Sequence, residues 1–219
     1  MVEFVSIVMS VYNERPDLLE KCIYSIIDQT HSNFEFLIID DGSTKIETVT
    51  KLDLICTKDN RIKLLRKTNK GLTKSLNYGI EQCKSDIIFR QDSDDWSHKN
   101  RIETQLNCLK ENPDCILVGL RPVFCQENGN PLWISQLPLA HKKIVNAFKT
   151  MNPFCHGSVC FKKKYFYELG GYDELLPVCQ DYDLFWRMSH RGLSMNLNKP
   201  LYFLRKTGSS ISSKRGLEQ

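Results

Sequence analysis

A short run near the start of the chain constrains the fold more than any other feature. Residues 5–11 read VSIVMSV, and apolar side chains stand at positions that would face either side of a strand. A strand that is apolar on both faces is typical of the buried interior of a parallel sheet. The run therefore predicts a parallel β-sheet at the centre of the protein.

Helical and strand patterns alternate through the first half of the chain. Pro16 opens a segment whose apolar residues recur with helical spacing up to Ile27. Further strands are predicted at 34–39, 62–65, 86–89 and 115–118, and further helices at 72–83 and 101–109. Such alternation indicates βαβ units. We therefore predict an α/β fold with a mainly parallel sheet.

The pattern changes after residue 120. The sequence ENGN at 127–130, between two apolar stretches, predicts a β-hairpin. A helix near 140–149, a strand near 157–162 and a helix near 181–190 are expected to follow. Because no repeat or low-complexity linker separates the halves, we predict one domain, 1–219, in which residues 120–219 are built onto a nucleotide-binding layer, 1–119.

The charges of the chain are nearly balanced but unevenly placed. There are 30 Lys and Arg against 26 Asp and Glu, and five of the basic residues lie between Lys199 and Arg215 without any acidic residue. This stretch predicts contact with an anionic membrane, a nucleic acid or a diphosphate, the alternative being a solvated tail. No apolar run approaches the ~20 residues of a membrane span, and residues 1–4 lack the features of a signal peptide. We therefore expect a cytoplasmic protein.

The nine cysteines are not spaced like a metal site or a disulfide framework. No C-x-x-C pair occurs, and the count is odd. Several stand in apolar contexts, where a free cysteine behaves as a small buried hydrophobe. We predict reduced, structural thiols.

Polar clusters follow three of the predicted strands. They comprise residues 10–13 (SVYN), 40–43 (DDGS) and 91–95 (QDSDD). In open α/β sheets, ligands bind outside the carboxyl ends of the strands, where these clusters are expected to converge. The chain has neither the G-x-G-x-x-G nor the G-x-x-x-x-G-K-[ST] pattern, which argues against a Rossmann dehydrogenase or a P-loop phosphotransferase.

The densest of these clusters contains Asp92, Asp94 and Asp95 within four residues. Like charges so close repel one another, and a bound divalent cation would relieve the repulsion. Oxygen-only ligands suit Mg²⁺ or Mn²⁺, which substrate phosphates commonly complete. The alternative is an Asx-turn and helix cap, with Asp94 or Asp95 preceding a helix.

Five motifs in order carry a resemblance to a known family. They read VSIVMSVYN at 5–13, IIDDGST at 38–44, NKGLTKSLN at 69–77, DSDD at 92–95 and QDYDLFWR at 180–187. Together they resemble a family 2 glycosyltransferase of the GT-A fold, which is inverting and uses a nucleotide sugar. The resemblance extends over about residues 5–212. It implies that 1–119 bind the nucleotide sugar and 120–219 the acceptor.

The resemblance implies a role for each matching residue on the donor side. The chain around Ser10 and Tyr12 would hold the nucleoside, and Asp41 would accept a hydrogen bond from its base, uracil. Asp92 would lie near the ribose. Asp94 would bind the metal that bridges the diphosphate.

On the acceptor side, the resemblance implies that Asp181 is the catalytic base. The alternative from its position is an N-cap of the 181–190 helix, and one aspartate can do both. On the donor side, Asp95 would support the loop that carries Asp94. His156 and Trp186 are predicted to face the acceptor, Trp186 by stacking on a sugar, although a lone His is more often structural.

Two positions depart from the family pattern. The family often has Glu where Gln180 stands, which would alter an acceptor contact. It usually has His at the place of Thr207, and the metal or diphosphate would then depend on Arg205, Lys206 or the nearby serines.

The resemblance implies a metal-dependent hexosyltransferase that moves a hexose or N-acetylhexosamine from a UDP-sugar to a glycan or lipid-linked oligosaccharide in surface polysaccharide synthesis. It would work in the cytoplasm, with peripheral contact at the inner face of the plasma membrane. One rival is a sugar-1-phosphate nucleotidyltransferase, which needs a Gly-rich loop that residues 12–16 lack. Another is a catalytically weak nucleotide-sugar- or glycan-binding module, favoured by Gln180 and Thr207 and opposed by Asp94 and Asp181. The acidic clusters argue against a nucleic-acid partner.

Overall fold

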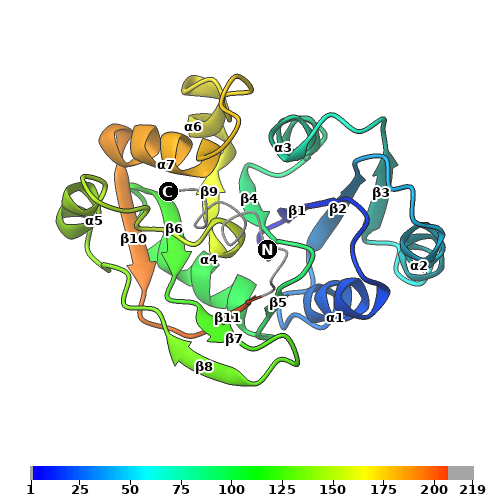
Figure 1. Ribbon diagram of the computed structural model, residues 1–219. Helices are drawn as coiled ribbons and strands as arrows, with labels where there is room; N and C mark the ends of the chain where they lie inside the picture. Colours follow the sequence, from blue (N-terminus) through cyan, green and yellow to red (C-terminus); the bar gives the residue numbers. More distant parts are fainter. Residues whose placement is uncertain (1, 207–219) are drawn as a thin grey trace.

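A seven-stranded sheet forms the centre of the protein in the computed structural model, which describes residues 2–206 (Figure 1). Its strands are β1 (Val5–Val11), β2 (Phe34–Asp40), β3 (Ile62–Arg66), β4 (Ile87–Arg90), β6 (Cys115–Leu120), β9 (Cys160–Lys162) and β10 (Leu193–Leu197). Their order is β10-β6-β9-β4-β1-β2-β3. All neighbouring pairs are parallel except the two that involve β9. The predicted α/β fold with a mainly parallel sheet is confirmed.

Helices cover both faces of this sheet. One face packs against α1 (Pro16–Ile27), α2 (Ile46–Cys56) and α4 (Arg101–Glu111), and the other against α3 (Leu72–Glu81), α5 (His141–Ala147), α6 (Lys163–Glu168) and α7 (Gln180–Arg191). Strand β1 serves both layers, since Ile7 and Met9 join the first cluster and Val8 the second. This is why the opening run of the sequence is apolar on both faces.

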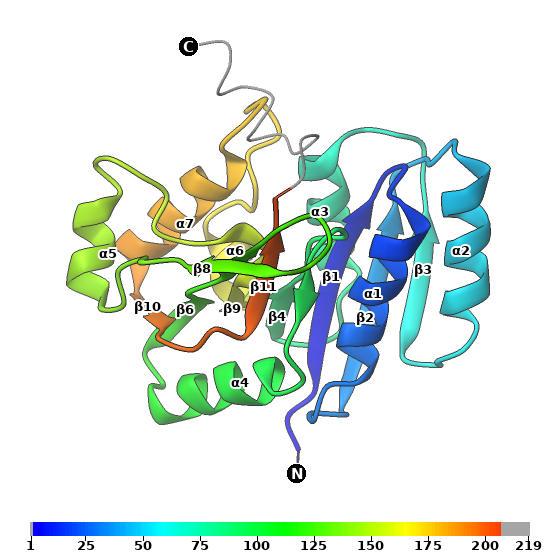
Figure 2. The same ribbon diagram turned by 60° about the horizontal axis from the view of Figure 1, so that its bottom comes forward.

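A smaller sheet lies beside the large one (Figure 2). Its strands, in order, are β5 (Trp96–Ser97), β11 (Tyr202–Arg205), β7 (Val123–Cys125) and β8 (Pro131–Ile134). Strands β7 and β8 form the predicted hairpin. Strand β11 pairs antiparallel with β5. Because β5 directly follows the acidic cluster at 92–95, a segment from the end of the described chain lies next to that cluster in space.

The structure contains elements that the sequence patterns did not predict. These are α2, α6, β5, β10 and β11. Helix α2 is the longest of them, and a distant residue fixes the turn that leads into it. Asn13 Oδ1 accepts hydrogen bonds from the backbone N–H groups of Thr44 and Lys45, at 2.8 and 2.9 Å. The N-cap residue of α2 is Lys45, whose side chain makes no capping hydrogen bond, so the sequence carries no local capping signal.

The helix-cap alternative for the acidic cluster is wrong. Helix α4 begins at Arg101 and its N-cap residue is Asn100, while Asp94 and Asp95 precede β5. The cysteine prediction is confirmed. All nine thiols are free, and all except Cys56 and Cys179 are buried.

No helix within residues 2–206 is long and apolar enough to cross a lipid bilayer. Part of the basic stretch that the sequence predicts at 199–215 belongs to 207–219, outside the residues that the structure describes. The departure at Thr207 lies there too.

The packing of α3 on the sheet predicts an unusual effect at Gly79. A Cβ at this position would lie 2.6 Å from Ile39 Cδ1 and 2.8 Å from Val8 Cγ1. Gly79→Ala should therefore destabilise the fold by about 1–3 kcal/mol, although Ala alone would favour a helix by about 1 kcal/mol. Denaturant unfolding measures the sign. Lys74→Ala, at an exposed position of α3, is the control, and a stabilising Gly79→Ala would contradict the close packing.

Candidate functional site

Three polar segments meet at the carboxyl edge of the large sheet. They follow β4, β1 and β2, which are adjacent in the sheet order, so the predicted convergence is confirmed. Side chains join the segments directly. Ser93 Oγ donates to Glu14 Oε2 at 3.3 Å, and the backbone N–H of Asn13 donates to Ser43 Oγ at 3.0 Å. The loops after the three strands thus form one surface.

The loop after β1 holds two of the predicted nucleoside contacts. Ser10 is half-buried near the end of β1, and Tyr12 is 53% exposed. Between them and α1, Asn13 adopts a left-handed φ of 53°, which Asn tolerates better than most residues. This conformation turns its side chain towards the start of α2. Tyr12 is left open to a ligand.

Asp41 is buried among donors of the protein itself. Its carboxylate accepts hydrogen bonds from Lys67 Nζ at 2.9 Å and from the backbone N–H groups of Lys70 and Gly71 at 3.0 and 2.8 Å. Burial acts to raise its pKa, but these donors outweigh it, and the pKa lies below the usual value. Asp41 therefore orders the loop that leads into α3. Its contact with a nucleobase stays a prediction.

The loop at 92–95 is held by contacts from α1 and from β11. Cys22 Sγ, on α1, donates to the backbone carbonyl of Asp92 at 3.2 Å. Asp95 accepts from the Tyr202 hydroxyl at 2.8 Å and from the Arg205 N–H at 2.7 Å. Arg205 Nε also donates to the carbonyl of Asp94 at 3.0 Å. The supporting role expected of Asp95 follows from these contacts.

The three carboxylates of this loop experience different fields. Burial, with the charges of Asp92 and Glu14, raises the pKa of Asp94 to about 7. Burial and the charges of Asp94 and Asp92 raise the pKa of Asp95 well above its usual value. Burial acts on Asp92 as well, but Arg90 and His156 lower its pKa below the usual value. Negative charge is thus in excess around Asp94.

Asp94 fits a divalent cation better than its neighbours do. Within residues 2–206 its carboxylate accepts no hydrogen bond from another side chain, whereas those of Asp92 and Asp95 do. No three His, Cys, Asp or Glu side chains converge on one point in that part of the chain. Mg²⁺ and Mn²⁺ are often held by one or two carboxylates and completed by substrate phosphates. The donor set therefore suits an ion that arrives with its substrate.

Asp181 lies at the start of α7, on the other side of the site. Its Oδ2 accepts a hydrogen bond from Asn152 Nδ2 at 2.8 Å. Helix α7 begins at Gln180, and Cys179, with a left-handed φ of 61°, is its N-cap residue. The N-cap alternative for Asp181 is therefore wrong, and its carboxylate is half-buried and partly open to solvent.

The other acceptor-side candidates on α7 are placed differently. Gln180, the first residue of the helix, is half-buried next to Asp181. Trp186 is 44% exposed and contacts His190. Five residues of helix turn Trp186 about 140° away from Asp181, so the structure does not bring these two side chains together.

His156 precedes β9 and lies below the loop of the acidic cluster. Its Nε2 is 2.8 Å from the Tyr172 hydroxyl and 3.3 Å from Arg90 Nε. Burial and the nearby Arg90 lower the pKa of His156 to about 4. Arg90 itself is fully buried and forms an ion pair with Asp92. His156 thus connects to the donor side of the site.

Sequence patterns did not single out several residues that build this site. They are Arg90, Arg101, Asn152, Tyr172 and Tyr202. Arg101, 1% exposed, donates to Gln91 Oε1 at 2.9 Å and to the carbonyl of Arg90 at 2.8 Å. One signal was present, because Arg90 ends an otherwise apolar strand, IIFR, and a charge there needs a buried partner.

The two basic candidates, Arg205 in β11 and Lys206 directly after it, lie in different surroundings. Arg205 is buried, lies beside the loop at 92–95 and stacks over Trp96, with 4.9 Å from its guanidinium carbon to the ring centroid. Lys206 is exposed, and its Nζ lies 4.9 Å from the ring centroid of Trp133 on the hairpin. Only Arg205 is near Asp94.

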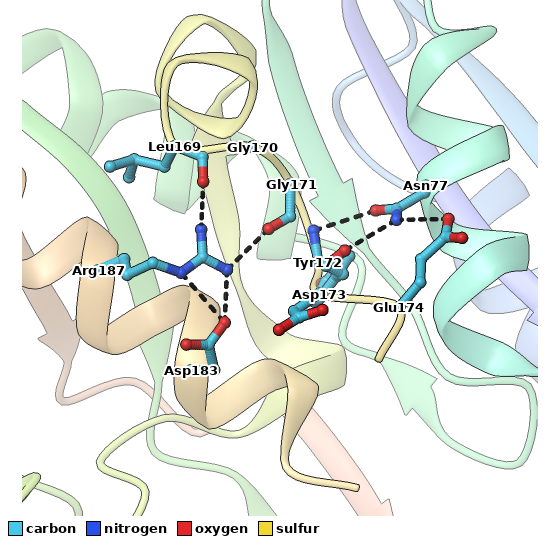
Figure 3. Close-up of a pocket in the computed structure, with 9 residues that line it drawn as sticks. All are labelled: Asn77, Leu169, Gly170, Gly171, Tyr172, Asp173, Glu174, Asp183 and Arg187. Carbon is cyan, nitrogen blue, oxygen red and sulfur yellow. Dashed lines mark hydrogen bonds and ion pairs between the residues drawn. The ribbon is translucent and has the colours of Figure 1, made fainter. Parts of the chain in front are cut away.

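An open pocket of about 550 Å³ flanks the site between α3, α7 and the loop at 169–174 (Figure 3). Arg187 donates to the carbonyls of Leu169 and Gly171, at 2.5 and 2.8 Å, and pairs with Asp183. Asn77, on α3, clamps the same loop from the opposite side. The pocket wall is therefore rigidly tied to both helices.

Comparison with known proteins gives a family and several relatives. The family described as Glycosyl transferase family 2 matches residues 6–170. The chain is 30% identical over 217 residues to the amylovoran biosynthesis glycosyltransferase AmsE of Erwinia amylovora, across 96% of this chain and 79% of AmsE. It is 34% identical over 191 residues to the O-antigen biosynthesis glycosyltransferase WbnJ of Escherichia coli, across 86% of this chain and 72% of WbnJ.

A solved structure shares the fold. The S. aureus TarS 1–349 structure in complex with UDP-GlcNAc matches with a TM-score of 0.77 at 17% identity. The match covers 95% of this chain and 60% of that one, so this chain spans about three fifths of its length. The GT-A expectation for the fold is confirmed.

The donors around Asp41 predict a pH-dependent loss of stability on substitution. Asp41→Asn removes the charge that Lys67 and two backbone N–H groups stabilise, and should cost about 2–3 kcal/mol at pH 7. Since the folded pKa of Asp41 is lowered, its contribution is present above the ordinary carboxyl pKa of about 4 and is lost as the pH falls below it. Denaturant unfolding at several pH values, with the exposed Asp114→Asn as control, checks this. A pH-independent difference would contradict it.

The close approach at Gly157 predicts a coupled effect with Tyr202. A Cβ on Gly157 would lie 2.5 Å from Asp92 Oδ2 and would overlap the Tyr202 hydroxyl. Gly157→Ala should destabilise the protein by about 1–3 kcal/mol. Adding Tyr202→Phe removes the overlapping oxygen, so the double variant should be more stable than the sum of the single changes predicts. Strictly additive free energies of unfolding would show that the contact is absent.

Proposed function

The chain belongs to glycosyl transferase family 2, and on this basis we propose that it transfers a hexose or N-acetylhexosamine from a UDP-sugar to a glycan or lipid-linked acceptor with inversion. The observation that carries the proposal is the state of the loop at 92–95. Its outer carboxylates are occupied by protein donors, and Asp94 is left for a cation and its diphosphate. The complex of TarS with UDP-GlcNAc supports this choice of donor.

The donor would bind across the three strand ends. Tyr12, exposed directly after β1, would offer an aromatic face to the nucleoside, and the ion pair with Arg90 would hold the Asp92 carboxylate that we propose lies near the ribose. Asp94 would hold Mn²⁺ or Mg²⁺, which when bound supplies Lewis-acid stabilisation of the charge on the leaving diphosphate. Arg205 places a fixed positive charge next to that loop.

The acceptor would react from the α7 side. Asp181 is the group proposed to take the proton from the attacking hydroxyl, and Asn152 fixes its orientation. Inversion by direct attack requires no nucleophile from the protein, and Asp181 is the carboxylate that α7 offers to a hydroxyl on that side. Arg187 and Asn77 keep the neighbouring wall in place.

The setting proposed for this reaction is the synthesis of a surface polysaccharide. The relatives named for amylovoran and O-antigen biosynthesis support it. A lipid-linked acceptor would require the protein to work at the cytoplasmic face of a membrane. Lys199 and Lys206, the exposed basic residues in the described part of the basic stretch, would then provide its attraction to anionic lipid.

Turnover with substituted carboxylates tests the proposal. UDP release from a panel of UDP-sugars is followed with Mn²⁺ and then with a chelator. Asp181→Asn should lower kcat by about 10²–10⁴-fold with little change in donor KM. Asp94→Asn should abolish the Mn²⁺-dependent rate, and Asp114→Asn should leave it unchanged.

Two outcomes would favour other functions. If UDP raised the Tm but no UDP-sugar turned over, a nucleotide-sugar-binding module would be supported instead. Full turnover in both Asp94→Asn and Asp181→Asn would refute the assigned mechanism. Unchanged turnover in the chelator would refute the metal assignment alone.

A further inference from the structure

The side chain of Arg90 lies at the centre of a buried polar cluster between the two sides of the site. It ends β4 and is fully buried. One end of its guanidinium pairs with the Asp92 carboxylate, and Nη1 donates to the carbonyls of Val8 and Gln91 at 3.3 and 2.6 Å. The remaining donor, Nε, points to His156 Nε2 at 3.3 Å. All three nitrogens of the Arg90 guanidinium thus have a partner in the protein.

The contacts of His156 determine which of its nitrogens carries the proton. A guanidinium is always protonated and can only donate, so His156 Nε2 accepts from Arg90. The Tyr172 hydroxyl lies 2.8 Å from the same nitrogen. In this tautomer it donates to Nε2 and shares, with the longer contact from Arg90, the one lone pair of an unprotonated ring nitrogen. The ring is therefore neutral, with its proton on Nδ1.

Tyr172 reaches this position because its backbone is clamped to α3 (Figure 3). The N–H of Tyr172 donates to Asn77 Oδ1 at 3.1 Å, and Asn77 Nδ2 donates back to the Tyr172 carbonyl at 2.9 Å. The side chain of Tyr172 is 1% exposed. The Tyr172 hydroxyl that contacts His156 is thus positioned by α3 and not by the acidic loop.

The cluster also contacts the helix that carries the proposed base. The rings of His156 and Phe185 pack edge to face, with centroids 5.9 Å apart. Asp181 lies four residues before Phe185, on the same face of α7. The charge of Asp181 acts on both His156 and Tyr172. His156 thus contacts Arg90, the partner of the donor-side Asp92, and Phe185 on the helix that carries the acceptor-side Asp181.

We propose that His156 is a positioning residue, and that the Arg90–His156–Tyr172 cluster sets Asp181 at a fixed distance and angle from the donor-side loop. The inference rests on the proposed function, and it replaces the direct acceptor contact that the sequence suggests for His156. A neutral ring suits this place, because an imidazolium beside Asp181 would make that carboxylate a weaker base. Small errors in such placement cost rate rather than affinity.

Kinetics of matched variants test the positioning role. Tyr172→Phe and His156→Leu should each lower kcat for sugar transfer by about 10- to 100-fold, with donor KM changed less than about threefold. His156→Gln keeps an acceptor oxygen for Arg90 and Tyr172, and should restore most of kcat relative to His156→Leu. Tyr182→Phe is the control. Like Tyr172→Phe, it removes one tyrosine hydroxyl, but this hydroxyl donates to the backbone carbonyl of Phe148 and makes no contact with His156.

A structural role alone predicts a different result. Tyr172→Phe and Tyr182→Phe would then lower the Tm alike and leave kcat alike, and His156→Gln would be no better than His156→Leu. Either finding would overturn the proposal. If His156→Leu fails to fold, Tyr172→Phe and His156→Gln still decide between the two explanations.

A spectroscopic measurement tests the cluster independently of activity. In ¹⁵N-histidine-labelled protein, with the signals of His156 assigned by their loss in His156→Gln, we expect an unprotonated Nε2 and a protonated Nδ1 at pH 7. An imidazolium, or the opposite tautomer, would overturn the assignment. If the wild type turned over no UDP-sugar, the proposed function would be refuted, whereas these spectra would still decide whether the cluster exists as described.

Discussion

The candidate site depends on one buried carboxylate, that of Asp95. It accepts hydrogen bonds from the hydroxyl of Tyr202 and the N–H of Arg205, and so attaches β11 to the loop after β4. These residues are 107 and 110 positions apart from it in sequence. Without this attachment, the loop with Asp92 and Asp94 would keep its contacts with Cys22 and Arg90 but lose its tie through Asp95 to β11. Strand β11 of the small second sheet therefore holds the acidic cluster in place.

The rest of the site follows the same plan, in which a polar side chain from one segment fixes the backbone of another. Asn13 fixes the turn before α2, Asp41 orders the loop before α3, and Asn77 clamps the loop before α7. The polar groups of each of these side chains are hydrogen-bonded to other groups of the protein itself. Within residues 2–206, no side-chain hydrogen bond engages Tyr12, the Asp94 carboxylate or Oδ1 of Asp181, and these are the groups that a donor and an acceptor would need.

How far the sequence could be interpreted depends on the range of the interaction involved. The parallel core was predictable because alternation and helical spacing are local, and β1 showed it within seven residues. Helix α2 was missed because its N-cap residue, Lys45, provides no capping hydrogen bond. Strand β11 was missed because four residues ending in Arg205 gain their stability only by pairing with β5 and β7. Trp186 was given an acceptor role from its place in a motif, but the turn of α7 carries it away from Asp181.

The sequence by itself determined the architecture and the chemical composition of the site. Burial on both faces of β1 required a parallel sheet, and a parallel sheet gathers the ends of its strands at one edge. Only the tertiary structure decided which groups at that edge are free and which are used. Tyr202 engages Asp95, and Arg90 and Tyr172 engage His156. The Asp94 carboxylate accepts no side-chain hydrogen bond within residues 2–206, and long-range contacts of this kind leave no periodic pattern in a sequence.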